Sequence, residues 1–275
     1  MATIPGLADA ARRHAVMACR SAYELGEPSD ELLAECAIYA ASSRQPWSEP
    51  PITDPPVIEE SQRGDIGELR QAVETGDRLR AERWLARRID DPHDMFTVAV
   101  DDFEDLGHKL MVATTAWKLA SLFGQHGRFA SLRIALWEMT SYHGKRYQER
   151  GGALDAETLL DRLIGTMVAE KGDLVSAHAV FLLDAALQTD DEDVIRRVRD
   201  YLTNVCGPAS AGRVDRLKPV LTPYTLARDY GELLKAHAVA RRLGPRFPRI
   251  DFNRMIAAAA YNLEHTPSFE EYSFA

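Results

Sequence analysis

Residues 174–187 read Leu-Val-Ser-Ala-His-Ala-Val-Phe-Leu-Leu-Asp-Ala-Ala-Leu, and this stretch indicates the class of fold. It contains no glycine or proline, and its apolar run is longer than an ordinary strand. Leucine and alanine, which dominate it, favour helix. Almost no position looks solvated, so the segment predicts a helix that is largely buried.

Similar helical segments recur on both sides of this stretch, and clean alternating strands are absent. Between neighbouring segments the connections are short, which favours antiparallel packing. We therefore expect an all-α fold, one helical domain of about nine to ten mostly antiparallel helices without a sheet. The expected helices cover about 8–25, 30–42, 65–89 with a break at Gly76-Asp77, 94–123, 129–142, 155–171, 173–188, 191–205, 224–243 and 251–264.

Proline content sets the expected organisation of the chain. Residues 44–64 hold five prolines and few periodic apolar residues, so they predict a surface loop. We expect residues 1–43 to form an N-terminal helical hairpin packed on a helical body at 65–265. A tail follows at 266–275.

The overall composition excludes several classes of protein. The 275 residues are 45% hydrophobic and carry a net charge of −9, the opposite of the usual balance in nucleic-acid binders. Three cysteines without zinc spacing predict reduced thiols. No run of 18 apolar residues is present, and no basic segment followed by an apolar one opens the chain. We expect a cytoplasmic protein that binds neither nucleic acid nor membrane.

Histidines inside apolar helices are the main candidates for function. The tripeptide His-Ala-Val occurs at His14, His178 and His237, and His108 lies in a similar setting. A neutral imidazole is tolerated in a helix interior only when its nitrogens find partners. Four such rings on four separate helices suggest a shared transition metal. Each histidine alone also fits an ordinary core or surface role, because no compact metal motif is present.

Carboxylates surround His108 in the sequence. Glu104 lies at i−4 and Asp105 at i−3, so either can share a helix face with His108, and Asp102 is close by. A carboxylate beside a metal-binding histidine fixes its tautomer and raises its basicity. We predict Asp102 and Asp105 in this supporting role. Gly107 is unfavourable inside a helix, and the close approach of another helix or a ligand would explain it. The alternative is an acidic, solvated helix start.

His143 follows an expected helix within Ser-Tyr-His-Gly-Lys-Arg-Tyr (141–147). A histidine at a helix C-terminus is favoured by the helix dipole, which is the structural explanation. The functional alternative places His143 at the rim of an active site as a proton shuttle. With Glu104, it forms the predicted catalytic set.

The order and surroundings of the four histidines resemble the questin oxidase-like family. The matching segments are 14–33, 107–112, 177–180 and 236–239, followed by a helix at 252–263. The resemblance implies oxidation of polycyclic aromatic ketones or quinones with ring opening. It also implies a non-haem iron held by four histidines and a carboxylated lysine, with His14, His108, His178 and His237 as the ligands here. Ala240 stands where the family has the lysine.

The expected cofactor is therefore non-haem iron or another transition metal, with O₂ as co-substrate. Nothing in the sequence argues against NADPH as a diffusible co-substrate. The expected partner is an aromatic small molecule, and the oligomeric state is left open. Aromatic side chains that could line its pocket are Trp117, Tyr142, Phe181, Tyr224 and Tyr230. The alternative function is a non-catalytic helical scaffold, or a degenerate family member that binds a small molecule or a protein.

Overall fold

A computed structural model describes residues 9–26, 64–122, 124–169, 174–204 and 223–264. Within these ranges the chain forms eleven α-helices and no strand, which confirms the expected all-α class. The predicted helix at 30–42, the Pro-rich loop at 44–64 and the tail at 266–275 lie outside the described ranges, except for Gly64. The helices are α1 (Asp9–Glu24), α3 (Ile66–Thr75), α4 (Arg78–Arg88), α5 (Asp94–Ala99), α6 (His108–Leu122), α7 (Gly124–Ser141), α8 (Ala156–Ala169), α9 (Leu174–Leu187), α10 (Glu192–Asn204), α11 (Pro223–Leu243) and α12 (Phe252–Glu264).

The predicted break at Gly76-Asp77 is confirmed. Asp65 begins α3 by accepting a hydrogen bond from the backbone N–H of Glu68. Gly76 ends α3 in the left-handed region with φ of 67°, a conformation that glycine adopts without a steric penalty. Asp77 then begins α4 by accepting from the N–H of Arg80. The break between α3 and α4 is therefore determined by residues within the segment itself.

The expected long helix over 94–123 is wrong. Helix α5 ends at Ala99, and α6 begins only at His108. Between them lies a tight turn, η2 (Glu104–Gly107), in which Asp105 and Leu106 have positive φ angles of 51° and 58°. Such backbone costs about 1–2 kcal/mol for each non-glycine residue, so only tertiary contacts can hold it. The next helix, expected from about residue 129, begins earlier, at Gly124.

Gly107 completes the turn with φ of 76°. A Cβ at this position would meet the side chain of Leu182 at 2.7 Å. Leu182 belongs to α9, so the close approach of another helix accounts for the glycine. The turn is thus both left-handed and pressed against α9.

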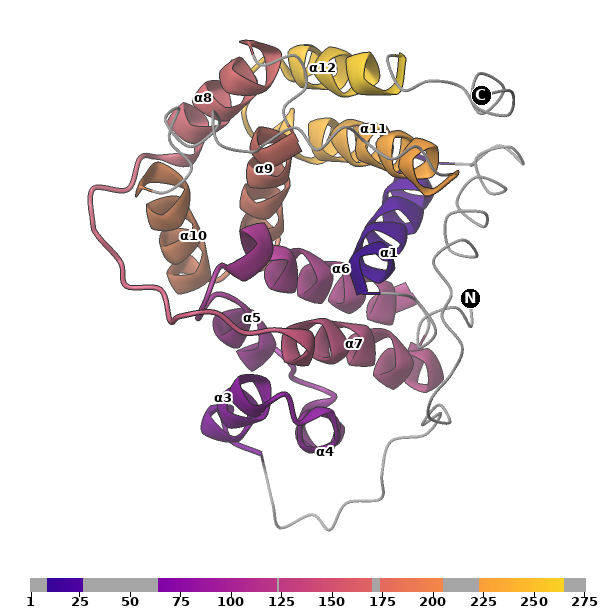
Figure 1. Ribbon diagram of the computed structural model, residues 1–275, viewed down its shortest axis with the longest axis vertical. Helices are drawn as coiled ribbons and strands as arrows, with labels where there is room; N and C mark the ends of the chain where they lie inside the picture. The colour runs from indigo at the N-terminus through magenta and orange to yellow at the C-terminus, as the bar shows by residue number, and fades with distance from the viewer. Residues whose placement is uncertain (1–8, 27–63, 123, 170–173, 205–222, 265–275) are drawn as a thin grey trace, which may run out of the picture.

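Four helices distant in sequence frame the centre of the described fold. In Figure 1, α1, α6, α9 and α11 form the sides of an open frame, and neighbouring members contact one another. Helix α7 packs along α6, and α3 and α4 pack on α7 from the other side, below it in the view, while α12 packs on α11 and α8. The core fills the space between these helices with side chains such as Trp84, Phe96, Leu110 and Leu136, each at most 1% exposed.

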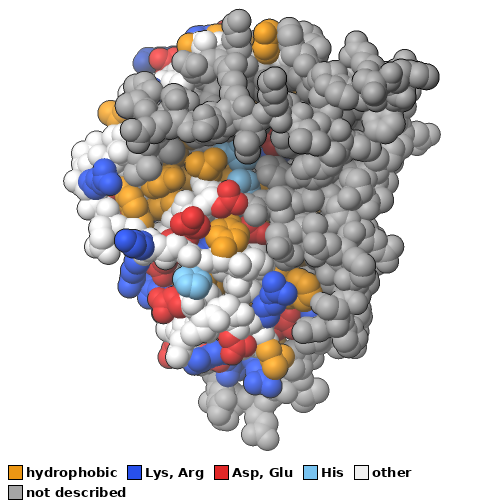
Figure 2. All heavy atoms as spheres, viewed as in Figure 1, with side chains coloured by type: hydrophobic (Ala, Val, Ile, Leu, Met, Phe, Trp, Pro, Cys, Tyr) orange, Lys and Arg blue, Asp and Glu red, His pale blue; other side chains and the backbone are white. Residues whose placement is uncertain are grey.

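The described surface carries mixed charge. On the face shown in Figure 2, basic and acidic side chains alternate without a continuous basic stripe. Among the described helices, none combines the length and apolar character required to cross a bilayer.

Candidate metal and ligand site

The structure brings two of the four candidate histidines together. His108 begins α6, and His178 lies in the first half of α9. Both are buried, with exposed fractions of 3% and 7%. Their ring centroids are 4.9 Å apart, with an angle of 53° between the ring planes. Two imidazoles from separate helices therefore face each other inside the protein.

The left-handed turn orients His108. Its Nδ1 lies 2.5 Å from the backbone carbonyl oxygen of Asp105, three residues earlier. A carbonyl can only accept, so Nδ1 carries the proton and donates it. The Nε2 atoms of His108 and His178 are both shielded from solvent. The neutral tautomer of His108 thus keeps its lone pair on the buried nitrogen, as a metal ligand requires.

The spacing of the two rings agrees with shared coordination. Imidazoles that bind one metal at about 2.0–2.2 Å, with bond angles of about 90–110°, have centroids about 4.6–5.3 Å apart. The observed 4.9 Å lies within that range. Within the described part of the chain, no group of three or more His, Cys, Asp or Glu side chains gathers as a metal site. The described pair is thus smaller than such a group, and its spacing is also that of ordinary aromatic packing.

The other two histidines have different positions. His14 lies in α1 one turn before Met17, and its side chain is outside the described part of the structure. His237 is exposed. It follows Lys235 by two residues, about 200° around the helix, so it faces away from the side of α11 that carries Lys235 and Val239. The structure does not bring His237 to the buried pair.

The acidic residues that the sequence places beside His108 do not all contact it in the structure. The carboxylate of Asp105 lies 3.9 Å from Nδ1 of His108, but its backbone carbonyl makes the closer contact. Asp102 accepts a 2.8 Å hydrogen bond from Nζ of Lys109, which is fully buried. Asp102 thus pairs with the lysine that follows His108. Because η2 interrupts the expected helix, the i−4 relation of Glu104 to His108 does not produce a shared helical face.

His143 and Glu104, the predicted catalytic set, are both exposed. The Glu104 side chain lies so close to Gly144 that a Cβ on that glycine would overlap it. His143 lines a separate pocket with Arg70, Asp101 and Asp102. Neither residue lines the pocket described next.

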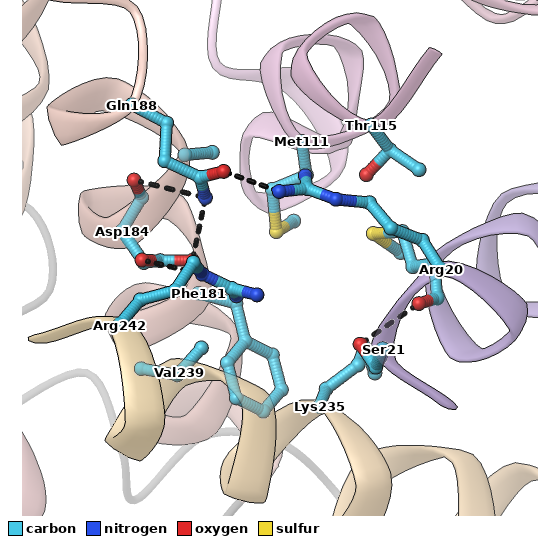
Figure 3. Close-up of a pocket in the computed structure, with 12 residues that line it drawn as sticks. Arg20, Ser21, Met111, Thr115, Phe181, Asp184, Gln188, Lys235, Val239 and Arg242 are labelled. Carbon is cyan, nitrogen blue, oxygen red and sulfur yellow. Dashed lines mark hydrogen bonds and ion pairs between the residues drawn. The ribbon is translucent and has the colours of Figure 1, made fainter. Parts of the chain in front are cut away.

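A small pocket, partly open to solvent, lies between α1, α6, α9 and α11. Figure 3 shows side chains from all four helices pointing into it. Met17, Met111 and Phe181 line it, and each stands three residues after one of the histidines. Each histidine position on α1, α6 and α9 is thus one helical turn from the pocket wall. Of the aromatic residues expected in a pocket, Phe181 lines this one, whereas Trp117 packs on Phe96.

A network of charges forms one side of the pocket. Arg242 of α11 donates to Asp184 of α9 at 2.6 Å and also pairs with Glu24 of α1. Arg20 donates to Glu24 at 2.8 Å and to the side-chain oxygen of Gln188. Burial acts to lower the pKa of Arg242, but the Asp184 and Glu24 carboxylates outweigh it and raise that pKa. The network ties three helices of the frame together.

Lys235 of α11 forms another part of the wall. It is 4% exposed and donates to Glu232 at 2.5 Å. Its ammonium lies 5.0 Å from the centre of the Phe181 ring, within cation–π range. The centroid of the Phe181 ring in turn lies 6.1 Å from that of the His178 ring. Phe181 therefore contacts both Lys235 and one member of the histidine pair.

This network of charged side chains beside the pocket was not predicted from the sequence. A signal was available in the apolar segment 174–187, where Asp184 is the only ionisable residue besides His178. A carboxylate in such a segment needs a buried partner. The partners Arg20 and Arg242 lie on other helices, and local spacing does not point to them.

Comparisons of the chain with protein-family models, with curated proteins and with solved structures gave no match. The resemblance of its histidine segments to the questin oxidase-like family therefore stays a prediction.

Proposed function

We propose that the protein is a metal-dependent oxygenase that oxidises an aromatic ketone or quinone in the pocket between α1, α6, α9 and α11. The observation that carries the proposal is the buried His108–His178 pair, with ring centroids 4.9 Å apart beside that pocket. The metal would be held by these two imidazoles, with His14 as the third expected ligand. His237 is left out of the ligand set because it is exposed on the far side of α11.

The protein's own residues have separate roles in this proposal. The turn at Asp105–Gly107 holds the His108 ring by its Nδ1–H and directs Nε2 inward. Phe181 and Met111 would provide the apolar part of the wall, against which a flat substrate lies. When bound there, a redox-active metal such as iron would supply the oxygen chemistry.

Metal analysis of the purified full-length chain tests the proposal. After anaerobic loading with iron(II), the unaltered protein should hold close to one equivalent. His178→Ala should lose the metal, because it removes one of two described ligands. His237→Ala should keep it, which separates the ligand set proposed here from the set that the resemblance implies.

Two outcomes would reject the proposal. One is binding of less than a tenth of an equivalent of any transition metal after reconstitution. The other is full retention of metal in His178→Ala. Either result would favour the alternative of a helical scaffold without a metal, in which the histidine pair contributes only packing. Oxygen uptake with a panel of hydroxylated quinones then tests the reaction itself.

A further inference from the structure

The turn between α5 and α6 is strained over three successive residues. Asp105, Leu106 and Gly107 have positive φ angles of 51°, 58° and 76°. Two of them are not glycine, so the turn is stable only where contacts outside these residues favour it over a continued helix. Strained backbone of this kind is often found where it orients a functional group. Here the group is His108, because the Asp105 carbonyl accepts hydrogen bonds from both its backbone N–H and its Nδ1.

One carboxylate holds both ends of this turn. Oδ1 of Asp102 accepts a 3.2 Å hydrogen bond from the backbone N–H of Glu104, the first residue of η2. Oδ2 of Asp102 accepts a 2.8 Å hydrogen bond from Nζ of Lys109, the residue that follows His108. A single side chain therefore links the start of the turn to the N-terminal turn of α6. Since the three left-handed residues lie between these two attachment points, the two links restrict the path of their backbone.

The Asp102–Lys109 pair is shielded from solvent. The side chains of Lys109 and Asp102 are 1% and 9% exposed. On its other side the ammonium lies 5.0 Å from the centre of the Tyr142 ring, within cation–π range, and the Tyr142 hydroxyl donates to buried Glu138 of α7. A buried ion pair adds little net stability compared with apolar side chains of similar volume, so stability alone does not account for this pair.

We propose that Asp102 and Lys109 are positioning residues for His108. Their ion pair holds the left-handed turn, and the turn keeps the ring proton on Nδ1 and the lone pair on Nε2. Asp102 thus acts through the backbone, which differs from the contact with the imidazole that the sequence predicts for it. The inference rests on the proposed function only where it makes His108 a metal ligand, because the tautomer of the ring is a property of the metal-free protein.

Nuclear magnetic resonance of the metal-free, full-length protein with isotope-labelled histidine rings tests the inference. Long-range proton–nitrogen correlations report which ring nitrogen carries the proton, and His108→Gln assigns the signals of His108. We expect wild-type His108 to carry its proton on Nδ1, in slow exchange with water because the ring is buried. In Asp102→Asn and in Lys109→Met this proton should exchange at least about tenfold faster, and the nitrogen signals should indicate a mixture of tautomers.

Glu82→Gln is the matched control. It breaks the ion pair with Arg133, which is similarly buried but joins α4 to α7 and does not involve the turn. This variant should leave the His108 signals unchanged. The variant that combines Asp102→Asn with Lys109→Met leaves no lone charge in the core, so it replaces either single variant that fails to fold. It should show the same faster exchange.

The inference is overturned if the folded variants of the pair keep the wild-type tautomer and exchange rate, or if Glu82→Gln changes them equally. An Nε2–H tautomer in the wild type would overturn it as well. Iron(II) titration separates it from the proposed function: the pair variants should bind the metal about 10–100-fold more weakly than wild type, and equal affinity would overturn the positioning role. Altered His108 signals without any metal uptake by the wild type keep this inference and reject the proposed function, whereas metal uptake with unaltered signals does the reverse.

Discussion

Replacement of Gly107 by alanine should destabilise the protein for two separable reasons. The residue has φ of 76°, a conformation that costs about 1–2 kcal/mol for alanine. The new Cβ would also lie 2.7 and 2.8 Å from the two Cδ atoms of Leu182, and relieving such an overlap in a packed core costs about 1–3 kcal/mol. The expected loss in the free energy of unfolding is therefore about 2–5 kcal/mol.

Two other glycines separate these contributions. Gly151 has φ of 78°, and a Cβ added to it would have no atom within 4 Å, so Gly151→Ala should show only the backbone cost of about 1–2 kcal/mol. Gly165 lies inside α8 with open space around it, so Gly165→Ala should stabilise by up to about 1 kcal/mol. Leu182→Ala removes all three side-chain atoms that Gly107→Ala would meet. In that background Gly107→Ala should cost no more than Gly151→Ala.

Urea denaturation followed by far-ultraviolet circular dichroism measures all these variants, with stability taken from the midpoint at constant slope. The reasoning is refuted if Gly107→Ala is no more destabilising than Gly151→Ala in the unaltered background. It is also refuted if the Leu182→Ala background leaves the cost of Gly107→Ala unchanged, because the overlap would then contribute nothing.

Two further predictions concern buried acids. Burial acts to raise the pKa of Asp200, but hydrogen bonds from the Tyr147 hydroxyl and two backbone N–H groups outweigh it, so the folded-state pKa is lowered. Asp200→Asn should lower the free energy of unfolding at pH 7 by about 2–3 kcal/mol. In urea titrations, the difference in this free energy between wild type and variant should shrink below about pH 4, because the wild-type carboxylate gains its proton. A difference that does not depend on pH would contradict this prediction. Glu82 accepts from buried Arg133 at 2.5 Å and from Trp137 at 2.7 Å, so Glu82→Ala should cost about 3–5 kcal/mol by removing the partner of a buried charge. The double variant with Arg133→Ala should lose less than the sum of the two single losses, and simple additivity in urea denaturation would refute the coupling.

The sequence alone determined the local structure of most described segments. Leucine and alanine content gave α9, and apolar periodicity with an acidic start gave α10, each within two residues of its observed ends. The break at Gly76-Asp77 was also local, because one glycine and two aspartates build it. These features follow from contacts within a few residues along the chain, which the sequence contains directly.

Tertiary structure decided which residues form the candidate site. The turn at Asp105–Gly107 exists although Asp105 and Leu106 disfavour its positive φ angles, because α9 packs against it. The same packing brings His108 to His178. The packing of α11 on its own neighbours leaves His237 exposed. Arg20 likewise meets α9 only in the folded chain. The face that a helix turns toward another helix depends on shape and charge across distant segments, and a spacing pattern within one segment does not contain that information.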